Sequence, residues 1–85
     1  MEEFKKLSEN LKTLRKDYGY TQKEIADKLG ITYQSYQAYE RGIAVPNLKN
    51  FIRLAEIYDV SMDFLIGKKD IWTEEKHRYR TYNFF

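Results

Sequence analysis

Residues 20–42 read YTQKEIADKLGITYQSYQAYERG, and this stretch contains the signals of two short helices joined by a tight turn. Thr21 is a good N-cap residue, and Glu24 three positions later completes a capping box. Gly30 stands where a residue in the left-handed conformation would end the helix. Three apolar residues between these signals share one helical face: Ile25, Ala26 and Leu29. The pattern predicts a helix that ends at residue 29.

The same signals recur in the second half of the stretch. Thr32 is the next N-cap residue, and Gly42 ends the second helix. Tyr36 and Tyr39 share its inward face, and Ala26 is small where the two helices should cross. Three residues near the start of the second helix face outward: Tyr33, Gln34 and Gln37. This is the local design of a helix-turn-helix, whose second helix reads the major groove of DNA.

Three further helices make the predicted fold all-helical. A helix over about residues 2–17 has an apolar stripe at steps of three and four: Phe4, Leu7, Leu11, Leu14 and Tyr18. Asn47 caps a fourth helix, whose core side is expected to comprise Leu48, Phe51, Ile52, Leu54, Ala55 and Tyr58. Ser61 caps a fifth helix over residues 62–66. We expect these elements to form one domain over residues 1–67.

The composition restricts the class of protein. Eighty-five residues suffice for one small domain and leave little room for a deep catalytic cleft. The chain has no cysteine and a single histidine, His77, so we expect no disulfide and no metal site. It contains no catalytic or nucleotide-binding motif, no signal-peptide pattern and no apolar run near the ~18 residues of a membrane span. We therefore expect a cytoplasmic binding protein that is not an enzyme and needs no cofactor.

The charges are distributed unevenly along the chain. The net charge is +2: residues 1–66 carry 10 Lys+Arg and 10 Asp+Glu, whereas residues 67–85 carry 5 and 3. A nucleic-acid-binding domain is usually more basic than this. Either the basic side chains gather on one face, or the affinity for nucleic acid is modest and sensitive to salt.

Three blocks of sequence occur in a specific order and spacing: LKTLRKDYGYTQKEIADKLGI (residues 11–31), YERG (39–42) and LAEIYDVSMDFLIG (54–67). Together they resemble the lambda-repressor-like (XRE-type) helix-turn-helix family of phage and bacterial regulators. The resemblance implies an all-α, five-helix domain that binds double-stranded DNA in a sequence-specific way. It also implies a homodimer on a palindromic operator, as in repressors of phages and mobile elements.

The resemblance further implies roles for individual residues. It puts base-reading side chains at Tyr33, Gln34 and Ala38, with Gln37 beside them. A glutamine amide donates and accepts at once, so it can pair with N6 and N7 of adenine in the major groove. Gln22 is implied to contact the DNA backbone, where free N–H groups at the start of a helix favour a phosphate, and to brace the recognition helix. Further candidates for backbone contacts are Thr21, Lys23, Arg41 and Lys49.

Two other sets of residues follow from the same resemblance. The family pairs an arginine of the first helix with the glutamate of the YERG block, which here are Arg15 and Glu40, as a structural ion pair behind the DNA-binding face. The family also forms a two-fold dimer at one end of the domain. We expect Met62 to be exposed there beside Ile43 and Val45, where apolar side chains suit a small contact.

The chain departs from the family in three places. Tyr36 occupies a position usually filled by valine or isoleucine, so we expect looser packing or a side chain turned toward solvent. The loop over residues 43–45 lacks the basic residues that often reach the DNA backbone, which favours a protein contact. Residues 68–85 form an aromatic and basic tail outside the resemblance, and residues 78–84 alternate as a short strand would. Its candidate contact residues are Trp72, Tyr82 and Phe84.

The tail leaves two roles open. Its basic residues can supply phosphate contacts, or its aromatic residues can cover a dimer seam or bind a partner protein, which is the role we expect. The alternative function is therefore a protein-binding module, such as an antitoxin or the target of an anti-repressor, that uses the tail and the loop over residues 43–45. The outward glutamines favour DNA binding instead.

Overall fold

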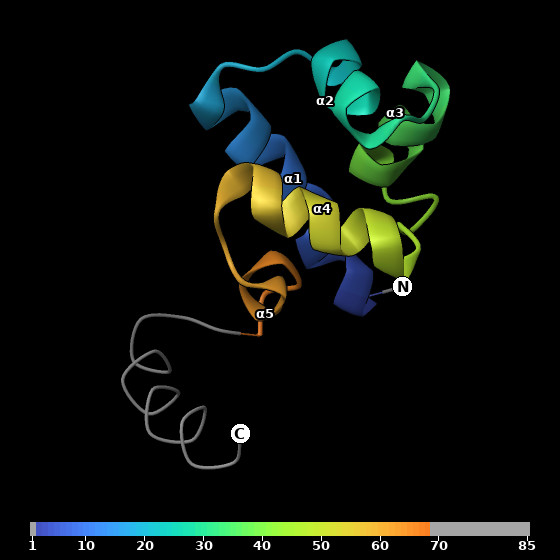
Figure 1. The fold of residues 1–85 in the computed structure, drawn as a ribbon. Coiled ribbons are helices and arrows are strands. Elements are labelled where there is room, and N and C mark those ends of the chain that lie inside the picture. Colours follow the sequence, from blue (N-terminus) through green and yellow to red (C-terminus); the bar gives the residue numbers. More distant parts are fainter. Residues whose placement is uncertain (1, 69–85) are drawn as a thin grey trace.

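The computed structural model describes residues 2–68, with side chains from residue 4 onward, and this part of the chain is all-helical, as predicted. Its five helices are α1 (Glu2–Tyr18), α2 (Gln22–Leu29), α3 (Tyr33–Arg41), α4 (Leu48–Tyr58) and α5 (Met62–Leu65) (Figure 1). None of these helices is long and apolar enough to cross a membrane. The tail residues Trp72, Tyr82 and Phe84 and the predicted strand over residues 78–84 lie outside the described residues.

Local hydrogen bonds determine where α2 and α3 begin and end. The predicted capping box is present, because the Glu24 N–H donates to Thr21 Oγ1 (3.1 Å) and the Thr21 N–H donates to Glu24 Oε1 (2.8 Å). The side chain of Thr32 caps α3 in a similar way. Gly30 and Gly42 end the two helices with φ angles of 72° and 77°, in the left-handed region where other side chains are strained. These stops keep α2 and α3 short and close together.

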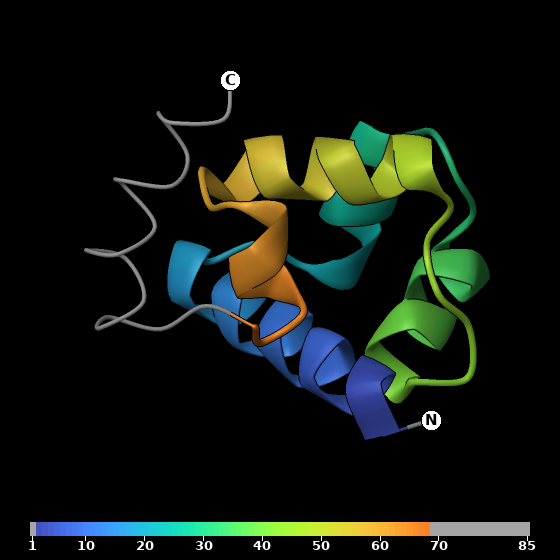
Figure 2. The same cartoon turned by 90° about the horizontal axis from the view of Figure 1, so that it is seen from below.

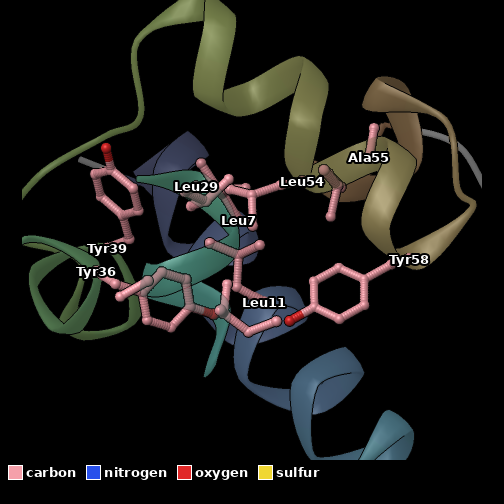
Figure 3. Close-up of a cluster of buried hydrophobic side chains, with 11 residues drawn as sticks. Leu7, Leu11, Leu29, Tyr36, Tyr39, Leu54, Ala55 and Tyr58 are labelled. Carbon is pink, nitrogen blue, oxygen red and sulfur yellow. The ribbon is translucent and has the colours of Figure 1, made fainter. Parts of the chain in front are cut away.

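The core lies where the helices meet. Six large side chains are fully buried: Leu11, Ile25, Tyr36, Leu54, Tyr58 and Leu65. Figure 3 shows several of them pointing toward one another from α1, α3 and α4. Ala26 is only 1% exposed and lies on α2, whose packing against α3 is the most extensive of any helix pair. α5 closes the core against α1 and α4 (Figure 2).

Two side chains that we predicted in the core lie at the surface of α4. Leu48 is 68% exposed and Ile52 is 39% exposed, so the prediction is wrong for both. The buried face of α4 is centred near Leu54 and includes Asn50, which donates to the Tyr39 hydroxyl at 3.3 Å. Because successive helical residues turn by about 100°, Leu48 and Ile52 lie about 120° and about 160° around the helix from Leu54, outside this face. A hydrogen-bonded asparagine takes the interior position instead.

Tyr36 is fully buried, which contradicts the predicted looser or solvent-facing packing. The hydroxyl explains the difference, because Tyr36 Oη donates to Glu40 Oε2 at 2.6 Å, one turn further along α3. The ring of Tyr36 also packs edge-on against the ring of Tyr39. The aromatic side chain therefore fills interior volume and at the same time supplies a donor to a buried carboxylate.

The carboxylate of Glu40 joins three helices. Arg15 on α1 donates from Nε to Oε2 (2.6 Å) and from Nη2 to Oε1 (3.0 Å), and Gln22 on α2 donates from Nε2 to Oε1 (3.0 Å). Together with Tyr36, these groups give each carboxylate oxygen two donors. Arg15 also donates from Nη1 to the carbonyl oxygen of Tyr20 at 3.0 Å. One buried charge thus connects α1, α2 and α3, and we term the side chains of Arg15, Gln22, Tyr36 and Glu40 the Glu40 network.

The network sets the ionisation of its members. Burial by itself would raise the pKa of Glu40, but the hydrogen bonds from Arg15, Tyr36 and Gln22 and the charge of the arginine hold that pKa below its ordinary value. Burial, together with the bond to Glu40, raises the pKa of Tyr36. Burial also raises the pKa of Tyr58 to about 12. At neutral pH the carboxylate is therefore ionised and both phenols are neutral.

Tyr36→Phe keeps the ring but removes one donor from the buried carboxylate. We expect the free energy of unfolding, measured by urea denaturation, to fall by about 1.5–3 kcal/mol, the usual value of a hydrogen bond to a charged group. Tyr33→Phe is a matched control, since the Tyr33 hydroxyl lies on the exposed side of the same helix and its loss should change stability by less than about 0.5 kcal/mol. Equal losses in the two variants would show that the Tyr36 hydroxyl has no special role.

The lowered pKa of Glu40 predicts a loss of stability in acid. Ionised Glu40 stabilises the fold above its unfolded pKa of about 4.5, and this contribution disappears as the pH falls through the lower folded value. Urea denaturation between about pH 7 and about pH 3 should show a shallower pH dependence for Glu40→Gln than for the wild type. Glu40→Gln should also be less stable at neutral pH by ~3–5 kcal/mol, because Arg15 loses its partner.

Glu56→Gln, at an exposed position of α4, is the control for this pH dependence and should behave as the wild type does. If Glu40→Gln does not fold, NMR titration of the Glu40 carboxyl carbon in the wild type gives the same information. A pKa at or above 4.5 for that carboxyl would contradict the prediction.

Candidate nucleic-acid interface

The outward face of α3 brings together the four residues predicted to read bases. At about 100° per residue, positions 33, 34, 37 and 38 share an arc of about 140°, away from the buried tyrosines of the same helix. Tyr33 and Gln34 are exposed, whereas Gln37 and Ala38 are half-buried. α2 and α3 form one end of the molecule, and α5 lies toward the other (Figure 1). The face therefore lies at one end of the domain, on a helix held by the Glu40 network.

The two glutamines of this face differ in their hydrogen bonds. Gln37 Nε2 donates to the Tyr33 hydroxyl at 3.1 Å, one turn back along the helix. The side chain of Gln34 forms no hydrogen bond with another residue in the described part of the chain. At the start of the helix, the hydroxyls of Thr32 and Ser35 bond to each other at 2.9 Å. Gln34 thus retains both a donor and an acceptor for a ligand.

The three candidates for backbone contacts at the start of α2 are not equivalent. Gln22 is half-buried, and its bond to Glu40 leaves its amide oxygen and a second N–H hydrogen for a ligand. The Thr21 hydroxyl is occupied as the helix cap. The side chain of Lys23 is 74% exposed, but its Nζ lies 3.5 Å from Asp27 Oδ2, which offsets part of its charge. Of the three, Gln22 is therefore the one that can couple a bound ligand directly to the Glu40 network.

Two cations stand on either side of the loop that joins α3 to α4. Arg41 is the last residue of α3, and Lys49 is the second residue of α4. Both side chains are exposed, and neither is ion-paired with a residue between positions 4 and 68. Their charges are therefore available to phosphates, although positive and negative charges balance over residues 1–66 as a whole.

Exposed apolar side chains follow one another along the same loop and the first turns of α4. Ile43 is 68% exposed and Val45 is 46% exposed, and the misassigned Leu48 and Ile52 come next. We term these four residues the apolar edge. The sequence pattern did not predict that Leu48 and Ile52 lie at the surface. The signal that marks them is their helical phase, which differs from that of the buried Leu54.

Met62 is 38% exposed, but it does not lie beside Ile43 and Val45 as predicted. The loop precedes the N-terminal end of α4, whereas α5 lies below the C-terminal part of α4 (Figures 1 and 2). The 11 residues of α4 span about 16 Å and separate the two sites. Met62 instead shares α5 with Phe64, which is 40% exposed.

Both the sequence and the fold of this chain are similar to those of proteins named as transcriptional regulators. A family model described as helix-turn-helix matches residues 11–65. The uncharacterized HTH-type transcriptional regulator YqaE of Bacillus subtilis is 51% identical over 59 residues, which make up 69% of this chain and 51% of that protein. The cryptic phage CTXphi transcriptional repressor RstR of Vibrio cholerae is 33% identical over 73 residues, 86% of this chain and 62% of the repressor.

The fold is also found in a solved structure. The crystal structure of a transcriptional regulator from Listeria innocua matches with a TM-score of 0.72 and 28% identity, over 93% of this chain and 77% of that one. The chain spans between half and two thirds of the length of the two curated relatives named above. From the capped helix pair, the family match and the shared fold, the chain belongs to the lambda-repressor-like (XRE-type) helix-turn-helix family.

Proposed function

We propose that this chain binds specific sequences in double-stranded DNA and regulates transcription, as a repressor of the phage or mobile-element type. The observation that supports this function most directly is the exposed Gln34, whose amide has no partner in the described part of the chain. Gln34 stands on a helix that the Glu40 network fixes to α1 and α2. The printed name of RstR, a phage transcriptional repressor, agrees with the proposal.

In this proposal α3 enters the major groove and its outward face reads bases. The amide of Gln34 pairs with N6 and N7 of an adenine, and Gln37 reads a neighbouring base. Ala38 offers a methyl contact, most naturally to a thymine methyl. Tyr33 lies at the edge of the face, within reach of sugar or phosphate.

The DNA backbone is held at both ends of this face. Gln22 binds a phosphate at the start of α2, where the helix dipole favours negative charge, and its bond to Glu40 transmits the position of that phosphate to α3. Arg41 and Lys49 bind phosphates near the loop after α3, while Thr21 and Lys23 contribute less because they already have partners in the protein.

The protein acts as a homodimer on a palindromic operator, with two half-sites about 34 Å apart. The apolar edge is the surface that suits the dimer contact, because Ile43 and Val45 adjoin the end of α3 and Leu48 and Ile52 extend the same edge. Met62 lies on α5 and is not part of this edge. In this proposal the protein works in the cytoplasm by binding DNA, without catalysis and without a cofactor.

A second function has two observations in its favour. The apolar edge and the balanced charge of residues 1–66 also suit a protein-binding module, such as an antitoxin or the target of an anti-repressor. In that case the edge and the tail with Trp72, Tyr82 and Phe84 grip a protein. Removal of residues 68–85 separates the two ideas: if DNA affinity stays intact while a partner protein no longer binds, protein binding is assigned to the tail.

Gln34→Ala tests the base-reading role. The duplexes are those that the wild type enriches from a random pool. We expect the variant to discriminate less well than the wild type at one base pair in each half-site, by about 1–3 kcal/mol. Fluorescence anisotropy against the four base pairs at each position measures the discrimination. If the variant prefers the same sequence as strongly as the wild type does, Gln34 is not the reading residue.

Lys49→Ala tests the backbone role. We expect the variant to weaken binding evenly across sequences and to reduce the slope of log K against log salt by about 0.9, the value for a single neutralised phosphate. Lys12→Ala, at an exposed position of α1, is the control and should leave the slope unchanged. A weakening confined to particular sequences would assign Lys49 to base recognition instead.

A further inference from the structure

The outward face of α3 contains one hydrogen bond that the roles above leave unexplained. Tyr33 and Gln37 lie one turn apart, and Gln37 Nε2 donates to Tyr33 Oη at 3.1 Å. Gln34, on the same face, has no such partner in the described part of the chain. We infer that Tyr33 is a positioning residue that holds the amide of Gln37 ready to read an adenine. This inference rests on the proposed entry of α3 into the major groove.

The direction of the bond determines what the amide can recognise. A glutamine amide has two N–H hydrogens and one carbonyl oxygen, and the Tyr33 hydroxyl accepts one of the hydrogens. The nitrogen is thereby held toward Tyr33, and the Gln37 Oε1 and the second hydrogen are left for the DNA. Adenine presents a donor at N6 and an acceptor at N7, which complement this pair. Guanine presents two acceptors and thymine one, so neither offers a donor to the amide oxygen.

The bond also reduces the side-chain conformational entropy that Gln37 loses on binding DNA. An exposed glutamine loses side-chain freedom when it contacts a base, and a side chain already held in one arrangement loses less. Tyr33 is suited to hold it, because it is the first residue of α3, directly after the Thr32 cap. The benefit of the Tyr33 hydroxyl should therefore appear in the discrimination between bases at one position. It should not appear as a general affinity for phosphates.

The test is a double-mutant cycle with the full chain: wild type, Tyr33→Phe, Gln37→Ala and the double variant. Binding is measured to duplexes selected by the wild type, with each of the four base pairs placed at the position where Gln37→Ala loses discrimination. We expect adenine at that position in the wild type. We expect Tyr33→Phe to reduce the preference for adenine by about threefold to tenfold, with no further effect in the Gln37→Ala background.

Discrimination at the position read by Gln34 should be the same in all four proteins, which controls for damage to the helix. Additive losses, spread evenly over all sequences, would show that the Tyr33 hydroxyl acts only as a backbone contact and does not position Gln37, and would overturn the inference. A preference for guanine or thymine at the Gln37 position would overturn the assigned orientation of the amide. A wild type that enriches no sequence at all would overturn the proposed function itself.

Discussion

The carboxylate of Glu40 is the constraint on which the rest of the domain depends. It is 4% exposed and accepts four hydrogen bonds, from Arg15 on α1, from Gln22 on α2 and from Tyr36 on its own helix. A buried carboxylate with fewer donors would be costly, and removal of one partner of a buried pair leaves a stranded charge. The donors come from three helices, so the carboxylate is satisfied only when those helices hold one mutual arrangement. We regard this geometric specificity as the main contribution of the network, since a buried ion pair adds little net stability compared with apolar packing.

The same constraint links the interior to the proposed DNA-binding surface. Gln22 bonds to Glu40 from the start of α2, where a phosphate is favoured, and Glu40 lies near the end of the helix whose outward face carries Gln34. A phosphate contact at one helix and a base contact at the next would therefore be fixed relative to each other through a single carboxylate. The interior therefore includes polar side chains such as Glu40 and Asn50, whereas the apolar Leu48 and Ile52 are exposed. An edge of that kind is suited to protein contact in a domain this small.

Much of the fold could be predicted from local signals in the sequence. The caps at Thr21 and Thr32 and the stops at Gly30 and Gly42 limit α2 and α3 as expected, because each depends on residues only a few positions apart. The interior of α4 is less predictable, since counting apolar residues favours Leu48 and Ile52 over Asn50, which needs the Tyr39 hydroxyl to be buried. The burial of Tyr36 is missed when its side chain is considered by volume alone, although Glu40 stands one turn away on the same helix face. Arg15 and Glu40 are 25 positions apart, so only the family resemblance could suggest that they pair.

In the proposed complex, the Glu40 network presents α3 to the major groove in a fixed orientation. The most direct measurement is the crystal structure of the full chain with a duplex that it selects from a random pool. We expect α3 in the major groove, the Gln34 amide against N6 and N7 of an adenine, and the bond from Gln22 to Glu40 retained beside a phosphate. A complex in which the DNA contacts another surface, or in which Gln22 leaves Glu40 to reach the backbone, would contradict the claim.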